Sequence, residues 1–150
     1  MKDQENLLKL EDIHVHYGGV KALDGATVYL NDGEILALMG PNGAGKSTIL
    51  KALFGIAPVM KGDIYWLGDK IFPKPHEIVE RGISFVPQGR QIFKSLTVLE
   101  NLEMGGFSIS SNAVLKANIK NVLELFPDLV KKLKVPAKNL SGGQQQMVAI

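Results

Sequence analysis

The chain has 150 residues, 45% of them hydrophobic and 21% charged, a composition typical of a folded globular domain and not of a disordered segment. Its formal net charge of +2 is too small to favour nucleic acid as a partner. The chain contains no cysteine, which excludes disulfides and thiolate metal sites and suits a reducing compartment such as the cytoplasm.

The first third of the chain is predicted to be rich in strands. Residues 7–17, LLKLEDIHVHY, alternate imperfectly between apolar and polar, as in a half-buried strand. A second strand is expected at 25–30, and NDGE at 31–34 predicts a turn. The run EILALM at 34–39 is continuously apolar, which is typical of a strand buried on both faces. It leads directly into the glycine-rich segment 40–48, GPNGAGKST.

The middle of the chain is predicted to alternate between helices and strands. A helix is expected over 48–55, and KGDIYWLGDK at 61–70 predicts a strand pair joined by a Gly-Asp turn. The segment PHEIVERG at 75–82 indicates a short helix with proline near its start. ISFVPQ at 83–88 indicates another buried strand.

The last third is predicted to be helical. Thr97 and Glu100 have the spacing of a capping box and predict a helix start. Residues 112–126 place their apolar side chains at helical spacing. A third helix is expected to begin at Ser141, because Gln144 repeats the Ser-x-x-Gln cap.

The segment after the third predicted strand matches a phosphate-binding loop. Gly40, Gly45, Lys46 and Ser47 satisfy the pattern G-x-x-x-x-G-K-[ST]. Glycines let the backbone N–H groups turn inward to phosphate oxygens, and the following helix adds its positive N-terminal end. We expect Lys46 to contact the β- and γ-phosphates, Ser47 to hold Mg²⁺, and Thr48 to support the same phosphates. The predicted ligand set of the loop is Gly40, Pro41, Asn42, Gly43, Ala44, Gly45, Lys46, Ser47 and Thr48.

A second predicted anion-binding helix start lies near the end of the chain. LSGGQ at 140–144 offers a capping serine, Ser141, and two amides without side chains, those of Gly142 and Gly143. A phosphate loop followed by this pentapeptide resembles the ATP-binding cassette (ABC) ATPases. The resemblance implies a head-to-tail dimer in which the signature of one subunit covers the γ-phosphate held by the loop of the other. The signature residues are Leu140, Ser141, Gly142, Gly143 and Gln144.

Three further positions match the family pattern. Tyr17 is placed where the family stacks adenine on an aromatic side chain, and Val20 lies at the edge of that pocket. Gln88 matches the glutamine that contacts Mg²⁺ and the attacking water. The resemblance therefore implies ATP and Mg²⁺ as cofactors, with Ser47 and Gln88 as the magnesium ligands.

The resemblance extends over essentially the whole chain and is similar in detail to bacterial branched-chain amino-acid importers and the related urea and amide importers. VHYGGVKALDG, PHEIVERGISFVPQGRQIFKSLTVLENL and ELFPDL carry it. In that group the position of Gln88 is often glutamate, so urea-type members remain an alternative. The implied partners are a second ATPase subunit, identical or paralogous, membrane permease subunits and, indirectly, a solute-binding protein, with no nucleic acid. The implied location is the cytoplasmic face of the cell membrane, reached through the permease, because no apolar run suits a spanning helix.

The resemblance implies an α/β P-loop NTPase fold: a β-subdomain and P-loop core over about 1–95, then a helical subdomain with the signature over about 96–150. Family members hydrolyse ATP with an Asp-Glu strand end and a histidine that normally follow the signature. The chain has neither, since His14, His16 and His76 all precede the signature. We therefore interpret the chain as truncated after the signature and expect it to bind ATP with negligible turnover.

Three alternatives remain open from the residues. A soluble ABC protein that acts on nucleic acid or ribosomes usually has long insertions or a second cassette, which the compact spacing disfavours. A P-loop GTPase or kinase is disfavoured because the chain lacks Asn-Lys-x-Asp and Asp-x-x-Gly segments. A non-catalytic nucleotide-binding half-domain also fits the residues.

Overall fold

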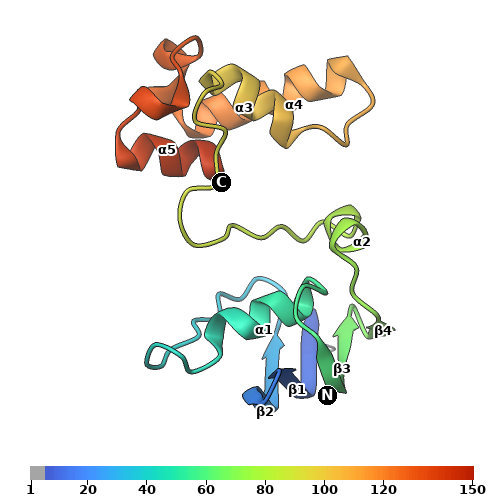
Figure 1. The fold of residues 1–150 in the computed structure, drawn as a ribbon. Helices are drawn as coiled ribbons and strands as arrows, with labels where there is room; N and C mark the ends of the chain where they lie inside the picture. Colours follow the sequence, from blue (N-terminus) through green and yellow to red (C-terminus); the bar gives the residue numbers. More distant parts are fainter. Residues whose placement is uncertain (1–5) are drawn as a thin grey trace. The chain divides into compact units, whose positions relative to one another are not determined.

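The computed structural model describes residues 6–150 and divides the chain into two compact units (Figure 1). The N-terminal unit, Met1–Phe85, contains the strands, and the helical unit, Val86–Ile150, contains helices and short 3₁₀ turns. No helix in the described range combines the length and the apolar character needed to cross a bilayer.

The N-terminal unit is built on a four-stranded antiparallel sheet with the order β2-β1-β3-β4. The strands are β1 (Leu8–Tyr17), β2 (Val20–Leu30), β3 (Val59–Trp66) and β4 (Asp69–Ile71). The β1 prediction is confirmed, and β2 begins five residues before the predicted strand, at Val20. The predicted strand pair is also confirmed. Its turn, however, centres on Leu67 and Gly68, whose positive φ angles of 52° and 83° are those of a tight hairpin turn.

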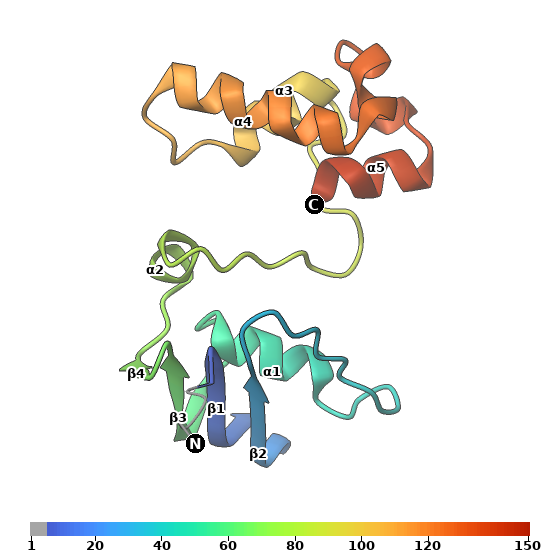
Figure 2. The same ribbon diagram turned by 180° about the vertical axis from the view of Figure 1, so that it is seen from behind.

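Helix α1 (Lys46–Leu53) covers one face of this sheet (Figures 1 and 2). Ala52 and Leu53 are buried against the inward side chains of β1, and the short helix α2 (Pro75–Glu80) adds Ile78 to the same core. The alternation of β1 explains this packing, because successive strand residues face opposite sides of the sheet. The buried core of the unit comprises Leu10, Ile13, Val15, Leu23, Ala52, Leu53, Phe54, Ala57, Ile64, Ile71 and Ile78.

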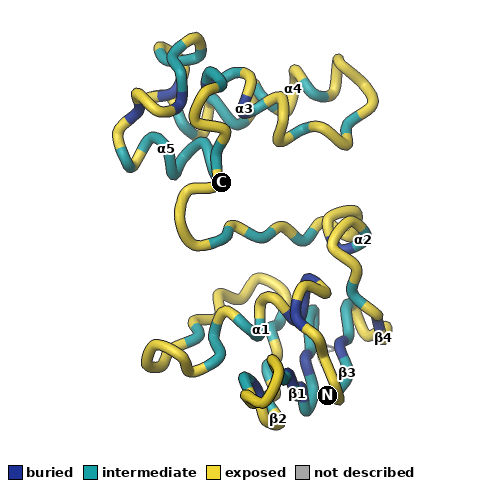
Figure 3. The backbone as a smooth tube through the Cα atoms, viewed as in Figure 1, coloured by how far each residue is buried: buried dark blue, intermediate teal, exposed yellow. Residues whose placement is uncertain are grey.

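Two predicted strands are wrong. Residues 34–39 and 83–87 have no regular secondary structure, and Gln88 lies in a bend. Ile35 is 97% exposed and Met39 is 90% exposed, so the first segment is far from the doubly buried strand that its apolar run predicted (Figure 3). A strand forms only where a neighbour satisfies its backbone groups, and among the described residues no strand lies beside either segment.

The helical unit has its own apolar core. Its elements are α3 (Val98–Gly105), α4 (Asn112–Leu125), α5 (Gly142–Ala149) and two 3₁₀ turns, η1 (Pro127–Lys132) and η2 (Ala137–Asn139). Val98, Leu129 and Ala137 are fully buried, and Leu140 is almost so. Ile92 packs against these residues, so the chain before α3 also belongs to this unit.

The predicted helix starts of this unit are confirmed. The Thr97 hydroxyl accepts a hydrogen bond from the Glu100 amide at 3.3 Å, and the Glu100 carboxylate accepts one from the Thr97 amide at 2.7 Å. These bonds to the Glu100 carboxylate lower its pKa, because they favour its charged form. Ser141 and Gln144 form the same reciprocal pair at the start of α5.

Candidate functional site

The phosphate loop lies against β2 through Gly45, the residue that caps α1. Gly45 has φ of 84°, in the left-handed region that favours glycine. A Cβ at this position would lie 2.6 Å from the Cδ2 atom of Leu23 and 2.8 Å from the carbonyl oxygen of Ala22. Glycine is therefore required for two reasons: the backbone conformation, and the close approach of the loop to the strand.

The loop holds several backbone donors ready for an anion. The amide of Ala44 donates to the Pro41 carbonyl at 3.2 Å, and that of Thr48 to the Gly45 carbonyl at 2.9 Å. Within residues 6–150, the structure pairs no acceptor with the N–H groups of Gly43, Gly45, Lys46 and Ser47. Unpaired N–H groups at a loop and helix start form an anion-binding arrangement.

Lys46 folds back across the loop. Its Nζ donates hydrogen bonds of 2.7 Å to the Gly40 carbonyl and 2.6 Å to the Pro41 carbonyl. The ammonium is therefore held over the loop that carries the unpaired amides. Positive charge and N–H donors converge there, which suits a phosphate group.

The residues predicted for adenine lie on the hairpin of β1 and β2. Tyr17 and Val20 are opposite each other in the register, joined by Gly18 and Gly19. Tyr17 is 43% exposed and Val20 is 67% exposed, so both offer apolar surface to a ligand. Both belong to the N-terminal unit, as the phosphate loop does.

The predicted magnesium residues differ in their surroundings. Ser47 is exposed in the first turn of α1, directly after Lys46. Gln88 is exposed as well, but it belongs to the helical unit. The geometry thus brings Ser47 and Thr48 together with the loop amides. The described residues contain no cluster of three His, Cys, Asp or Glu side chains that could hold a metal.

The signature forms the start of α5. Ser141 is the N-cap, Gly142 and Gly143 open the helix, and Leu140 is anchored in the core of the helical unit. In the described part of the chain, no acceptor is paired with the amides of Gly142 and Gly143. The signature therefore presents two backbone donors at the positive end of a helix.

Two positioning residues were not anticipated from the sequence. Asn101 on α3 is 8% exposed, and its amide nitrogen donates to the carbonyls of Phe93 and Thr97 at 3.0 and 2.9 Å. Its oxygen accepts from the Phe93 amide at 2.8 Å. Gln145 donates to the carbonyls of Ala137 and Leu140 at 3.2 and 3.3 Å, which fixes the approach to the signature. No periodicity marks either residue, because a polar residue in a short helix is usually solvated.

The sequence profile of the ABC transporter family matches residues 23–150. The chain belongs to the ABC transporter family. It has the ABC nucleotide-binding fold, with the antiparallel sheet and the helices described above. It is similar to a nucleotide-free ATP-binding cassette from an ABC transporter, with a TM-score of 0.82 and 31% identity over 96% of this chain and 62% of that one. It is likewise similar to the ADP conformation of an ATP-binding cassette, with a TM-score of 0.80, 31% identity and the same coverage.

Curated relatives of this ABC protein are ATP-binding proteins of transport systems. The high-affinity branched-chain amino acid transport ATP-binding protein BraG of Pseudomonas aeruginosa is 40% identical over 96% of this chain and 62% of its own length. The probable branched-chain amino acid transport ATP-binding protein LivF of Archaeoglobus fulgidus is 35% identical over 96% and 61%. The xylose/arabinose import ATP-binding protein XylG of Sulfolobus acidocaldarius is 33% identical over 97% and 60%. The chain thus spans about three fifths of the length of these relatives.

Proposed function

We propose that this ABC protein binds ATP with its phosphates in the loop 40–48 and its adenine on Tyr17 and Val20. The observation that carries the proposal is the set of unpaired amides at Gly43, Gly45, Lys46 and Ser47, beneath the Lys46 ammonium. A nucleotide phosphate satisfies these donors and exchanges the carbonyl partners of Lys46 for anionic ones. Stacking of the base on an aromatic ring contributes about 1–3 kcal/mol in nucleic-acid systems.

Magnesium fits the same end of α1. The hydroxyl of Ser47 is an oxygen donor, as Mg²⁺ prefers, and it is exposed beside the loop amides. Ser47 would hold the ion together with phosphate oxygens, and Gln88 would supply a second side-chain oxygen. When bound, the ion neutralises charge on the phosphates.

We also propose that the signature completes the site of a second subunit in a head-to-tail dimer. The free amides of Gly142 and Gly143 and the capping hydroxyl of Ser141 support this role, since they form a second anion-binding helix start. In such a dimer, one nucleotide contacts the phosphate loop of one subunit and the signature of the other. The second subunit is a copy of this chain or a paralogue.

The proposed biological role is that of the ATP-binding subunit of an importer that takes up branched-chain amino acids. Two relatives named for this solute support it, whereas relatives named for xylose/arabinose, galactose and ribose support sugar import as the alternative. Urea or amide import is a further alternative, because residue 88 is glutamine, whereas the branched-chain amino-acid group often has glutamate there. In this role ATP hydrolysis drives uptake through membrane permease subunits at the cytoplasmic face, with a solute-binding protein acting outside.

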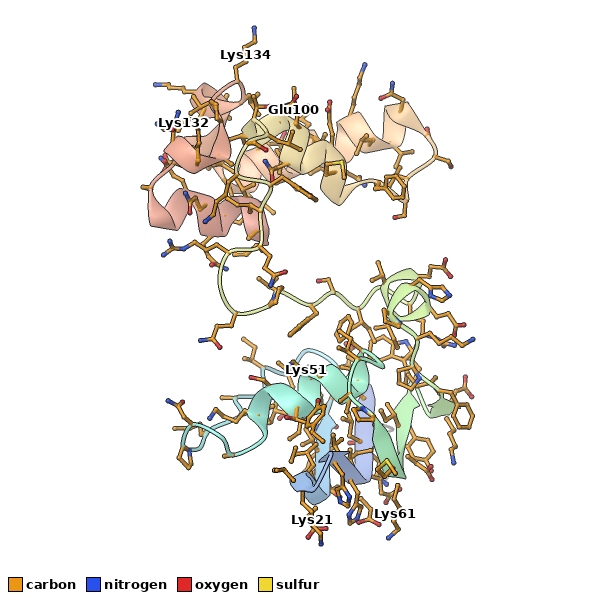
Figure 4. All side chains as sticks on the ribbon, in the orientation of Figure 1. Lys21, Lys51, Lys61, Glu100, Lys132 and Lys134 are labelled. Carbon is orange, nitrogen blue, oxygen red and sulfur yellow. The ribbon has the colours of Figure 1, made fainter. Side chains whose placement is uncertain are left out.

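The test is equilibrium binding of a fluorescent ATP analogue to the 150-residue chain. Lys46→Ala should weaken binding about 10- to 150-fold, because a hydrogen bond to a charged group contributes about 1.5–3 kcal/mol. The matched control is Lys51→Ala, another α1 lysine, which lies in the last turn (Figure 4). Equal affinities for the two variants would refute the phosphate-loop assignment. For the solute, cells without this gene should lose leucine uptake and keep xylose uptake.

A further inference from the structure

The two units carry charge of opposite sign. The helical unit has eight Lys and Arg against four Asp and Glu, a net charge of +4. The N-terminal unit has nine basic and eleven acidic residues, a net charge of −2. The small net charge of the whole chain therefore conceals a basic helical unit.

Most of that positive charge belongs to two segments, residues 89–97 and 129–138, which we call the basic surface. Neither segment contains an Asp or a Glu. The six cations of the basic surface are Arg90, Lys94, Lys131, Lys132, Lys134 and Lys138. Two carboxylates border the basic surface: Asp128, an exposed residue at the start of η1, and Glu100, which accepts hydrogen bonds from Thr97. None of the six takes part in an ion pair with another described residue.

The backbone holds the two segments side by side. The Lys138 amide donates to the Lys94 carbonyl at 3.0 Å, and the Ala137 amide to the Leu96 carbonyl at 2.8 Å. A short antiparallel bridge joins Thr97 to Pro136 between them. Beneath the basic surface, Leu129 and Ala137 are fully buried. The backbone of the two segments is thus held together near Lys94 and Lys138.

The exposed side chains among these cations are apolar as well as basic. Phe93 is 54% exposed beside Lys94, and Val130 is 49% exposed beside Lys131. Arg90 and Lys94 also line an open hollow of about 480 Å³ with Gln145 and Gln146, which is wide enough for a phosphate-bearing headgroup. Figure 4 shows Lys134 extending away from the helical unit into solvent.

We propose that the basic surface binds the anionic headgroups of a lipid membrane directly. Fixed, unpaired lysines suit a surface of lipid phosphates, and exposed Phe93 and Val130 suit the boundary between headgroups and acyl chains. A nucleic acid fits less well, because an aliphatic side chain such as Val130 has no base-stacking surface. This contact goes beyond nucleotide binding, because none of the six cations belongs to the phosphate loop 40–48 or to the signature 140–144.

The experiment is flotation of the 150-residue chain with vesicles of equal parts phosphatidylcholine and phosphatidylglycerol, without nucleotide. Each lysine near an anionic bilayer contributes about fivefold to the partition coefficient, so Lys131→Gln with Lys134→Gln should weaken binding about 25-fold. The matched control is Lys116→Gln with Lys120→Gln, which removes the same charge from α4 and should change binding by less than about threefold. Equal losses in the two double variants would reduce the effect to net charge and overturn the proposal.

Two further experiments distinguish binding to a membrane from binding to other polyanions. Phe93→Ser should weaken vesicle binding and leave binding to heparin unchanged, because only a bilayer receives an aromatic side chain. If Phe93→Ser alters neither, or if a short RNA duplex outcompetes the vesicles, the surface is not a membrane site. Lys46→Ala should float as the parent chain does. If Lys46→Ala and the parent chain bind ATP with equal affinity while both still float, the nucleotide proposal alone is overturned.

Discussion

Replacement of Gly45 by alanine tests how the phosphate loop is held against the sheet. The new Cβ would meet Leu23 at 2.6 Å and the Ala22 carbonyl at 2.8 Å, both well inside van der Waals contact. Gly43 is the matched control, because it has nearly the same φ, 85° against 84°, and open space where a Cβ would lie. The two substitutions share the backbone strain and differ in the clash with β2.

The magnitudes follow from these two terms. Left-handed backbone destabilises an alanine by about 1–2 kcal/mol, and both variants should lose this much. Forcing a methyl group into a packed position adds about 1–3 kcal/mol at Gly45 alone. Gly45→Ala should therefore lower the melting temperature of the N-terminal unit by about 5–20 °C more than Gly43→Ala, at about 4–8 °C per kcal/mol for a domain of this size.

Tryptophan fluorescence is the assay of choice. The chain has one tryptophan, Trp66 at the end of β3, so its emission reports the N-terminal unit alone. Thermal unfolding of the parent and of both alanine variants should be followed at this signal. Equal melting temperatures for the two variants would refute the reasoning, because the contact of Gly45 with β2 would then have no energetic weight.

Three further outcomes are expected. Tyr17→Ala should lower the affinity for ATP about 10- to 100-fold in a fluorescence titration. Tyr29→Ala, at a second exposed tyrosine of the same sheet, should leave it unchanged; similar losses would place the adenine elsewhere. Asn101→Ala should destabilise the helical unit by about 1–3 kcal/mol, because buried backbone groups lose their partner, and hydrogen exchange should then speed up at residues 93–97. The pKa of Asp12 is lowered because its carboxylate is hydrogen-bonded to Lys61 and, to a smaller extent, to His14. The stability that this carboxylate adds is therefore fully present above the ordinary pKa of an aspartate and is lost as the pH falls through the lowered pKa. In Asp12→Asn, the midpoint of thermal unfolding should therefore depend less on pH below about pH 4 than it does in the parent chain. The same pH dependence in both proteins would contradict this linkage.

The charge network around Asp12 gives that last prediction its structural basis. The ring nitrogens of His14 lie 2.9 Å from Asp12 and 3.1 Å from Asp24, so a carboxylate faces each of them. Figure 4 shows Lys21 and Lys61 at this same end of the sheet, where they pair with Asp24 and Asp12. The network is exposed, and salt should weaken it.

Local patterns predicted the caps and the phosphate loop well. Thr97 with Glu100, and Ser141 with Gln144, form the reciprocal bonds that their spacing predicts, because a capping box involves only one turn of chain. The glycines of the loop have the positive φ angles that an anion-binding turn requires. Motifs of this kind depend on contacts within a few residues, and a single sequence contains that information.

Features that depend on distant residues could not be predicted in the same way. The run at 34–39 has the composition of a central strand, yet pairing needs a neighbour, and composition does not say which one. The same limit applies to Asn101, whose partners at Phe93 and Thr97 follow from how α3 packs. The opposite net charges of the two units could not be predicted either, because each net charge depends on the boundary between Phe85 and Val86.

The bonds of Asn101 have a mechanical consequence. They fasten residues 93–97 to α3, while Val98 and Leu99 are bonded to the carbonyls of Val135 and Leu133. Residues 93–97 are thus tied to α3, and the start of α3 is tied to the segment that leads to the signature. A displacement of residues 93–97 should therefore move α3 and the segment before the signature together, because hydrogen bonds connect all three.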